Sequence, residues 1–210
     1  MIRRLLANSA TSLVIAACGG VAGVLGWRVG RPHVPPAPPA SVLSAAARSM
    51  QAAPSYAFSG RVTIGVEVLN VAGTFSAPDL LHETLQLVGG PPIERVSLGA
   101  VTYQRGPAGW RRVDSAATMA DPRAVFQALS GAASVARQGQ DYSFVLRTPS
   151  VTALVSGGSA ATVARGAALV EAGRVQSVTY RSSAGAGTTA TFAYTDIGTA
   201  AAVTVPALTS

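Results

Sequence analysis

The sequence predicts an α+β fold, in which a curved antiparallel sheet of eight or more strands forms a half-barrel around two or three helices. Apolar residues alternate with polar ones over most of residues 55–195, which is the period of a half-buried strand. Two short segments instead repeat their apolar residues at helical spacing. A charge-free run near the N-terminus adds a predicted membrane anchor helix in front of this domain.

The clearest strand begins at Tyr56, because the alternation continues from there over about a dozen residues. Its apolar even-numbered positions are Tyr56, Phe58, Val62, Ile64, Val66 and Val68. A tight reversal is expected near residues 67–70, followed by a second strand with Leu69, Val71 and Phe75 and a third with Leu81, Leu85 and Leu87. Breaks rich in glycine or proline separate further predicted strands at 93–98, 101–105, 110–114, 142–146, 161–171, 174–182 and 189–195. The apolar face of an antiparallel sheet of this size must be buried, so the helices are expected to lie across its concave side.

Two segments carry the signals of short helices. Residues 41–53 place their apolar side chains on one face, and Ser41 is the expected cap. Residues 121–131 begin with Asp121 as the expected cap and end at a glycine. A further short helix is a possibility at 148–156.

Residues 1–31 are predicted to be a signal or membrane anchor. Their charge-free stretch would measure about 34 Å as a helix, enough to cross a hydrocarbon core of roughly 30 Å. Residues 15–18 are similar to the lipobox of bacterial lipoprotein signals, in which the final residue, here Cys18, carries the lipid. An uncleaved helix and a lipidated Cys18 both stay open at this stage, and both place the chain on the extracytoplasmic face of the plasma membrane.

A proline-rich stretch at residues 32–40 is predicted to be a stiff linker. The domain proper is then expected at residues 41–210. The net charge of +7 does not indicate nucleic-acid binding, because the arginines outside the anchor are scattered singly except for Arg111 and Arg112. No nucleic-acid partner is therefore expected.

The sequence offers little for catalysis. His82 is the only histidine of the predicted domain, and no nucleophile neighbours it. Residues 185–190 match a dinucleotide fingerprint by letters, but they lie between two predicted strands and open no helix. One cysteine and two histidines provide no metal-ligand spacing. We therefore expect neither an enzyme, a metal site nor a cofactor.

Several segments carry a resemblance to a known group of proteins: Ser55–Gly60, Gly73–Asp79, Val101–Tyr103, Gly109 with Trp110, and Tyr194–Gly198 with Pro206. In these segments and in the order of its elements, the chain resembles the LolA/LolB superfamily of lipoprotein carriers. The similarity is greatest to the LppX/LprG-type envelope lipoproteins of actinobacteria and to the N-terminal domain of RseB-type proteins. It spans about residues 41–210 and implies a half-closed antiparallel barrel wrapped around helices.

In that superfamily the space between sheet and helices takes the acyl chains of lipoproteins or glycolipids. The resemblance thus implies a membrane-tethered extracytoplasmic binder or carrier of a lipid. By analogy the cavity would be lined by Phe58, Ile64, Phe75, Leu85, Phe144 and Phe192. The same side chains also suit a solid core. A solid core would favour the alternative, an RseB-like interaction or sensory module that binds another envelope protein.

Overall fold

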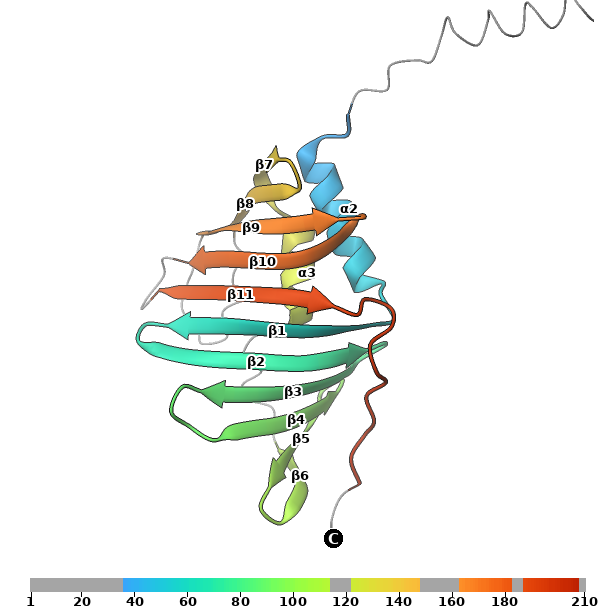
Figure 1. Ribbon diagram of the computed structural model, residues 1–210, viewed down its shortest axis with the longest axis vertical. Coiled ribbons are helices and arrows are strands. Elements are labelled where there is room, and N and C mark those ends of the chain that lie inside the picture. Colours follow the sequence, from blue (N-terminus) through green and yellow to red (C-terminus); the bar gives the residue numbers. More distant parts are fainter. Residues whose placement is uncertain (1–35, 114–121, 148–162, 183–186, 208–210) are drawn as a thin grey trace, which may run out of the picture. The chain divides into compact units, whose positions relative to one another are not determined.

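Eleven antiparallel strands form one open sheet in the computed structural model, which describes residues 36–113, 122–147, 163–182 and 187–207 (Figure 1). The strands of the first half are β1 (Ser55–Ile64), β2 (Glu67–Ser76), β3 (Leu80–Leu87), β4 (Pro92–Leu98), β5 (Val101–Gly106) and β6 (Gly109–Val113). Those of the second half are β7 (Ala133–Gln138), β8 (Asp141–Arg147), β9 (Val163–Glu171), β10 (Arg174–Ser182) and β11 (Thr188–Thr195). The helices are α2 (Pro39–Gln51) and α3 (Pro122–Ser130).

The order across the sheet is β6-β5-β4-β3-β2-β1-β11-β10-β9-β8-β7. Each half of the chain is a meander of sequential neighbours, and the pairing of β1 with β11 joins the halves at the centre. β6 and β7 occupy the two edges and do not pair with each other, so the sheet is curved but not closed (Figure 1). Both helices contact each other, and α2 packs on β7 and β10.

This architecture confirms the predicted antiparallel sheet of eight or more strands with helices on one side. The predicted anchor at residues 1–31, including Cys18, and the predicted helix at 148–156 lie outside the described residues. The chain divides into two units at the boundary between Pro36 and Ala37. In the part that the structure describes, no helix is both long and apolar enough to span a bilayer.

The first hairpin turns earlier than the sequence suggested. Its reversal is at Gly65 and Val66, since Ile64 pairs directly with Glu67, whereas the prediction placed it at 67–70. Gly65 adopts φ +60°, as the first central residue of a two-residue II′ hairpin must. Val66 is consequently 97% exposed at the tip of the turn instead of continuing the buried face of β1.

Two further predictions need correction. Helix α2 begins at Pro39 after Pro38, so Ser41 is not its cap but lies inside the first turn, where its hydroxyl donates to the Pro38 carbonyl. Proline suits this start because its missing N–H would have no partner there. Strand β7 had no prediction, because most of its side chains are exposed and a register shift between Ala133 and Ala136 interrupts the alternation.

The core lies between the helices and the inner face of the central strands. Helix α2 contributes Leu43, Ala46, Ala47 and Met50, and α3 contributes Val125, Phe126, Ala128 and Leu129. The sheet adds the aromatic side chains Tyr56, Phe58, Phe75, Tyr142, Phe144, Tyr180, Phe192 and Tyr194. The aromatic positions in β1, β2, β8 and β11 follow the alternation that the sequence predicted there, whereas the sequence predicted no inward position within β10.

Phenylalanines of the core lie directly over glycines. The register pairs are Phe58 with Gly73, Phe192 with Gly60 and Phe144 with Gly166. A Cβ atom at Gly60 would meet the Phe192 ring and would lie 2.7 Å from the Thr191 carbonyl oxygen. The rings therefore occupy the space that a side chain on the neighbouring strand would need, and they fill the layer next to the sheet.

The side chains on the inner face include more polar residues toward β6. Glu83 pairs with Gly73 and thus faces the same side as Phe58, yet it is a carboxylate that is only 3% exposed. The register continues this row through three more polar residues, Arg95, Gln104 and Arg111. One sheet face accordingly carries an aromatic region at its centre and a row of polar residues that crosses β3–β6, while Leu81 and Leu85 on the same face of β3 still belong to the core.

Candidate ligand pocket

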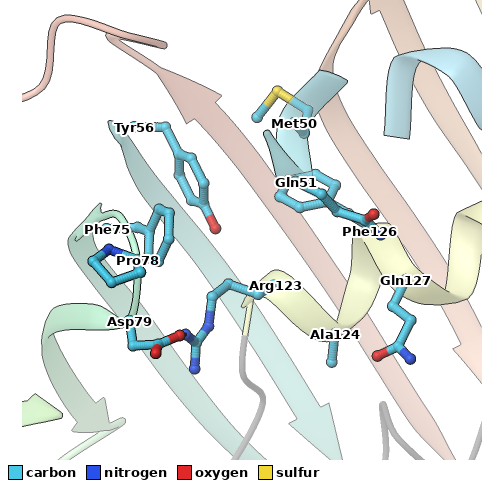
Figure 2. Close-up of a pocket in the computed structure, with 10 residues that line it drawn as sticks. All are labelled: Met50, Gln51, Tyr56, Phe75, Pro78, Asp79, Arg123, Ala124, Phe126 and Gln127. Carbon is cyan, nitrogen blue, oxygen red and sulfur yellow. The ribbon is translucent and has the colours of Figure 1, made fainter. Parts of the chain in front are cut away.

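A pocket of about 490 Å³ opens where the C-terminal end of α2 meets α3 and the β2–β3 connection (Figure 2). Its lining residues are Met50, Gln51, Tyr56, Phe75, Pro78, Asp79, Arg123, Ala124, Phe126 and Gln127. Sites for small ligands are usually concave, mostly apolar and between roughly 300 and 1,000 Å³. The volume of this pocket falls in that range, and its lining combines six apolar or aromatic residues with four polar ones.

The floor of the pocket is an aromatic cluster. The Tyr56 ring centroid lies 5.0 Å from that of Phe75 and 5.8 Å from that of Phe126, with the second pair edge to face. Phe126 in turn lies 4.8 Å from Tyr194. All four side chains are buried. The floor is thus apolar and densely packed, with rings at distances that favour one another.

The mouth of the pocket carries a pair of opposite charges. Figure 2 shows the Arg123 side chain extending from α3 toward Asp79, with Phe75 beside it. The Arg123 Nη1 atom lies 3.5 Å from Asp79 Oδ1, and the guanidinium is 5.6 Å from the centre of the Phe75 ring. Asp79 is 58% exposed and Arg123 30%. An ion pair this accessible contributes at most about 1 kcal/mol to folding.

The structure places the six predicted lining residues in two settings. Phe75 lines this pocket. Phe58, Leu85, Phe144 and Phe192 are buried in the core, and Ile64 packs partly buried against it. These five side chains are not brought to the pocket, so contact between them and a ligand stays a prediction.

A second pocket, of about 390 Å³, lies on the outer face between β2–β6 and the C-terminal segment. There His82 Nε2 lies 2.9 Å from one carboxylate oxygen of Glu94, and Arg105 donates to the other at 3.0 Å. The hydrogen bond from Arg105, with a smaller contribution from His82, holds the pKa of Glu94 below its usual value against the opposing effect of burial. His82 is therefore part of a surface hydrogen-bond network with Glu94 and Arg105.

No group of three or more histidine, cysteine, aspartate or glutamate side chains in the described ranges could hold a metal ion. The polar residues at the first pocket, Arg123 and Asp79, were absent from the sequence-based site. The sequence contained one signal for Arg123, because a cation in the first turn of a helix opposes the helix dipole and is unusual there. Asp79 ends one of the segments that carried the family resemblance.

Solved structures share this fold. The Mycobacterium tuberculosis lipoprotein LppX has a TM-score of 0.57 and 13% identity over 79% of this chain and 97% of its own. LprF from Mycobacterium bovis has a TM-score of 0.53 and 12% identity, over 80% of this chain and 95% of that one. No protein-family model matches the sequence, and a comparison with curated proteins gives no match either. The resemblance to the LppX/LprG type is thereby confirmed at the level of the fold.

Proposed function

We propose that this domain reversibly binds an amphipathic lipid at the extracytoplasmic face of the plasma membrane. The apolar chain would lie in the pocket between α2, α3 and the start of β1. The observation that carries the proposal is the pocket itself, with its aromatic floor and charged mouth. The fold shared with the lipoprotein LppX supports it.

Burial of the chain supplies the binding energy in this account. Each methylene group removed from water contributes about 0.8 kcal/mol. About ten buried methylenes therefore contribute about 8 kcal/mol, which corresponds to a micromolar dissociation constant before the costs of association. The rings of Tyr56, Phe75 and Phe126 line the pocket but are at most 4% exposed, so the chain would contact them only after the lining side chains rearrange.

The tether is part of the proposal. We infer that Cys18 is lipidated or that the segment around it remains as a helix in the bilayer, and the lipoprotein nature of LppX favours the first. The proline-rich linker would then keep the domain close to the membrane from which its ligand comes. Metabolic labelling with a palmitate analogue distinguishes the two anchors, because only lipidation gives a label that Cys18→Ala removes.

Native mass spectrometry of the gently purified protein tests binding. We expect lipid adducts on the wild type and their loss in Ala124→Phe, since Ala124 lines the pocket and a phenyl ring would fill it. The matched control is Ala45→Phe, at an exposed position of α2, which should keep its adducts. A wild type without adducts that also fails to bind fluorescent fatty acids would refute the proposal.

One observation favours a second function. The core next to the pocket is filled, since Phe192 and even the pocket-lining Phe126 are at 0% exposure. A filled core suits a non-catalytic interaction or sensory module whose sheet surface binds another envelope protein. Cross-linking in intact cells would then capture one partner, and the Ala124→Phe variant would capture it equally well.

A further inference from the structure

We propose that the outer face of β8–β10, the face away from the helices, docks on a membrane surface that carries anionic phospholipids. The contact would be made by Arg147, Arg165 and Arg181, which together form the arginine cluster. The inference goes beyond the proposed function, since it concerns how the domain approaches a bilayer and not what its pocket holds. It follows from the register of three neighbouring strands and from the charges around them.

The sheet brings together three arginines that are scattered along the sequence, because β8, β9 and β10 lie side by side (Figure 1). Arg165 of β9 and Arg181 of β10 are directly opposite each other in the register. Arg147 of β8 pairs with Val163, which lies two residues before Arg165 on the same face of β9. All three arginines are exposed, and in each strand the residue just before the arginine is buried in the core. The cluster therefore points away from the helices.

The direct opposition of Arg165 and Arg181 costs stability. Side chains of directly opposed residues begin about 5 Å apart, and like charges at such a position are destabilising. Across the described parts of the chain, none of the three arginine side chains forms an ion pair or hydrogen bond that would offset this repulsion. An anion from outside the chain would supply the missing counter-charge.

The acidic residues of β8 and β9 lie at the opposite ends of these strands. Asp141 begins β8 and Glu171 ends β9, so each is about 20 Å along its strand from the arginine of that strand. Glu67 begins β2, the third strand along from β10, which places it about 14 Å across the sheet. The chain between β8 and β9 and between β10 and β11 contains neither aspartate nor glutamate. This end of the outer face is therefore positively charged.

A bilayer surface suits the arginine cluster better than an enclosed ligand or a nucleic acid. None of the three arginines lines either pocket described above, so they offer an open surface. Their other partners in the register are Val145, Val163 and Thr189, which provide no aromatic ring on which bases would stack. Val163 is 38% exposed, an apolar group of the kind that a head-group region accommodates. Guanidinium groups bind phosphate through paired hydrogen bonds, and each basic side chain at an anionic membrane strengthens association by about fivefold.

Arginine footprinting of the full-length chain tests the inference. Phenylglyoxal modifies exposed guanidinium groups, and mass spectrometry of chymotryptic peptides locates them. The chain is added to preformed vesicles of phosphatidylcholine, or of phosphatidylcholine and phosphatidylglycerol in equal parts. We expect only the anionic vesicles to slow modification of the arginine cluster, at least about fivefold, and high salt to remove this protection. Arg48, exposed on α2, is the internal reference and should react equally in both.

A double variant tests the role of the charges. Arg165→Gln/Arg181→Gln removes the opposed pair and should unfold in urea at no lower concentration than the wild type, because it relieves repulsion. Protection of the remaining Arg147 by anionic vesicles should be lost. The matched control Arg48→Gln/Arg112→Gln loses the same charge from exposed positions of α2 and β6 and should keep the protection.

Several results would overturn the inference. These are no protection by anionic vesicles, equal protection by neutral ones, protection that extends equally to Arg48, and protection of Arg147 that survives in Arg165→Gln/Arg181→Gln. Stronger protection by a single-stranded RNA than by anionic vesicles, at equal phosphate concentration, would also overturn it in favour of a nucleic-acid site. None of these results bears on acyl-chain binding between α2 and α3, which native mass spectrometry tests separately.

Discussion

The two ends of the sheet present different chemistry on the same face. Under the helices, β1, β2, β8, β10 and β11 direct aromatic rings inward, and several of these rings pack on glycines or against the helices. Over β3–β6 the same alternation directs Glu83, Arg95, Gln104 and Arg111 inward. Alternation thus determines which side chains share a face, whereas the helices determine which part of that face becomes core. The pocket lies near the boundary between the two regions.

Truncation of aromatic side chains should give the largest difference in the free energy of unfolding between the two parts of the sheet. Phe126→Ala removes a fully buried ring that packs on Tyr56 and Tyr194, and it should lower the free energy of unfolding by about 3–5 kcal/mol. Trp110→Ala, on the half-exposed edge strand β6, should cost less than half as much. Urea denaturation measures both. Trp110 lies on the outer face, where it lines the second pocket, so equal losses would mean that this face of β6 is packed as tightly as the aromatic core.

Added methyl groups give the next largest effect. Gly60→Ala would place a Cβ atom against the Phe192 ring and 2.7 Å from a backbone oxygen, so we expect a loss of about 1–3 kcal/mol. Gly106→Ala in β5 meets one atom at 3.7 Å, an ordinary contact, and should change stability by less than about 0.5 kcal/mol. Thermal unfolding followed by circular dichroism compares the two. A tolerated Gly60→Ala would contradict the close packing of ring on glycine.

The buried hydroxyl pair of the polar region tests its hydrogen bonding. Ser97 and Thr102 lie 3.1 Å apart, and both are buried. Ser97→Ala leaves the Thr102 hydroxyl without this partner and should cost about 1–2 kcal/mol. The double variant Ser97→Ala/Thr102→Val removes both polar groups and should be nearly neutral in the same denaturation assay. A double variant that loses more than the single one would show that each hydroxyl has an independent role.

The smallest expected change in stability is for the ion pair between Arg105 and Glu94 on the outer face of β4 and β5. Arg105→Gln removes the main cause of the lowered pKa of Glu94 and should cost less than about 1 kcal/mol at pH 7. Because the folded pKa lies below the unfolded one, the stabilisation is present above the unfolded value of about 4.5. It is lost as the pH falls through the folded value. The gap between wild type and variant should therefore close in denaturation curves recorded toward pH 3, and a gap that widens there would contradict this origin.

The sequence predicted the sheet well because alternation is a local property. Phe192 and Tyr194 could be assigned to a buried face from their neighbours alone. Strand β7 was missed because it buries little, and the first turn was misplaced because Val66 continues the apolar pattern into it.

The candidate site was harder to predict, because it depends on topology. Asp79 and Arg123 are far apart along the chain and come together only when α3 is placed against the β2–β3 connection. Of the residues predicted to line a cavity, Phe75 alone reached the pocket. The reason is that alternation identifies inward side chains without showing which of them the helices leave uncovered.

Photo-cross-linking tests the central claim, that this pocket holds an acyl chain, most directly. A fatty acid with a diazirine near its terminal methyl group should label pocket-lining residues such as Met50, Tyr56 and Phe126. Unlabelled hexadecanoic acid should compete with the label, and Ala124→Phe should abolish it. Labelling that is confined to β4–β6, or that persists unchanged in Ala124→Phe, would contradict the account.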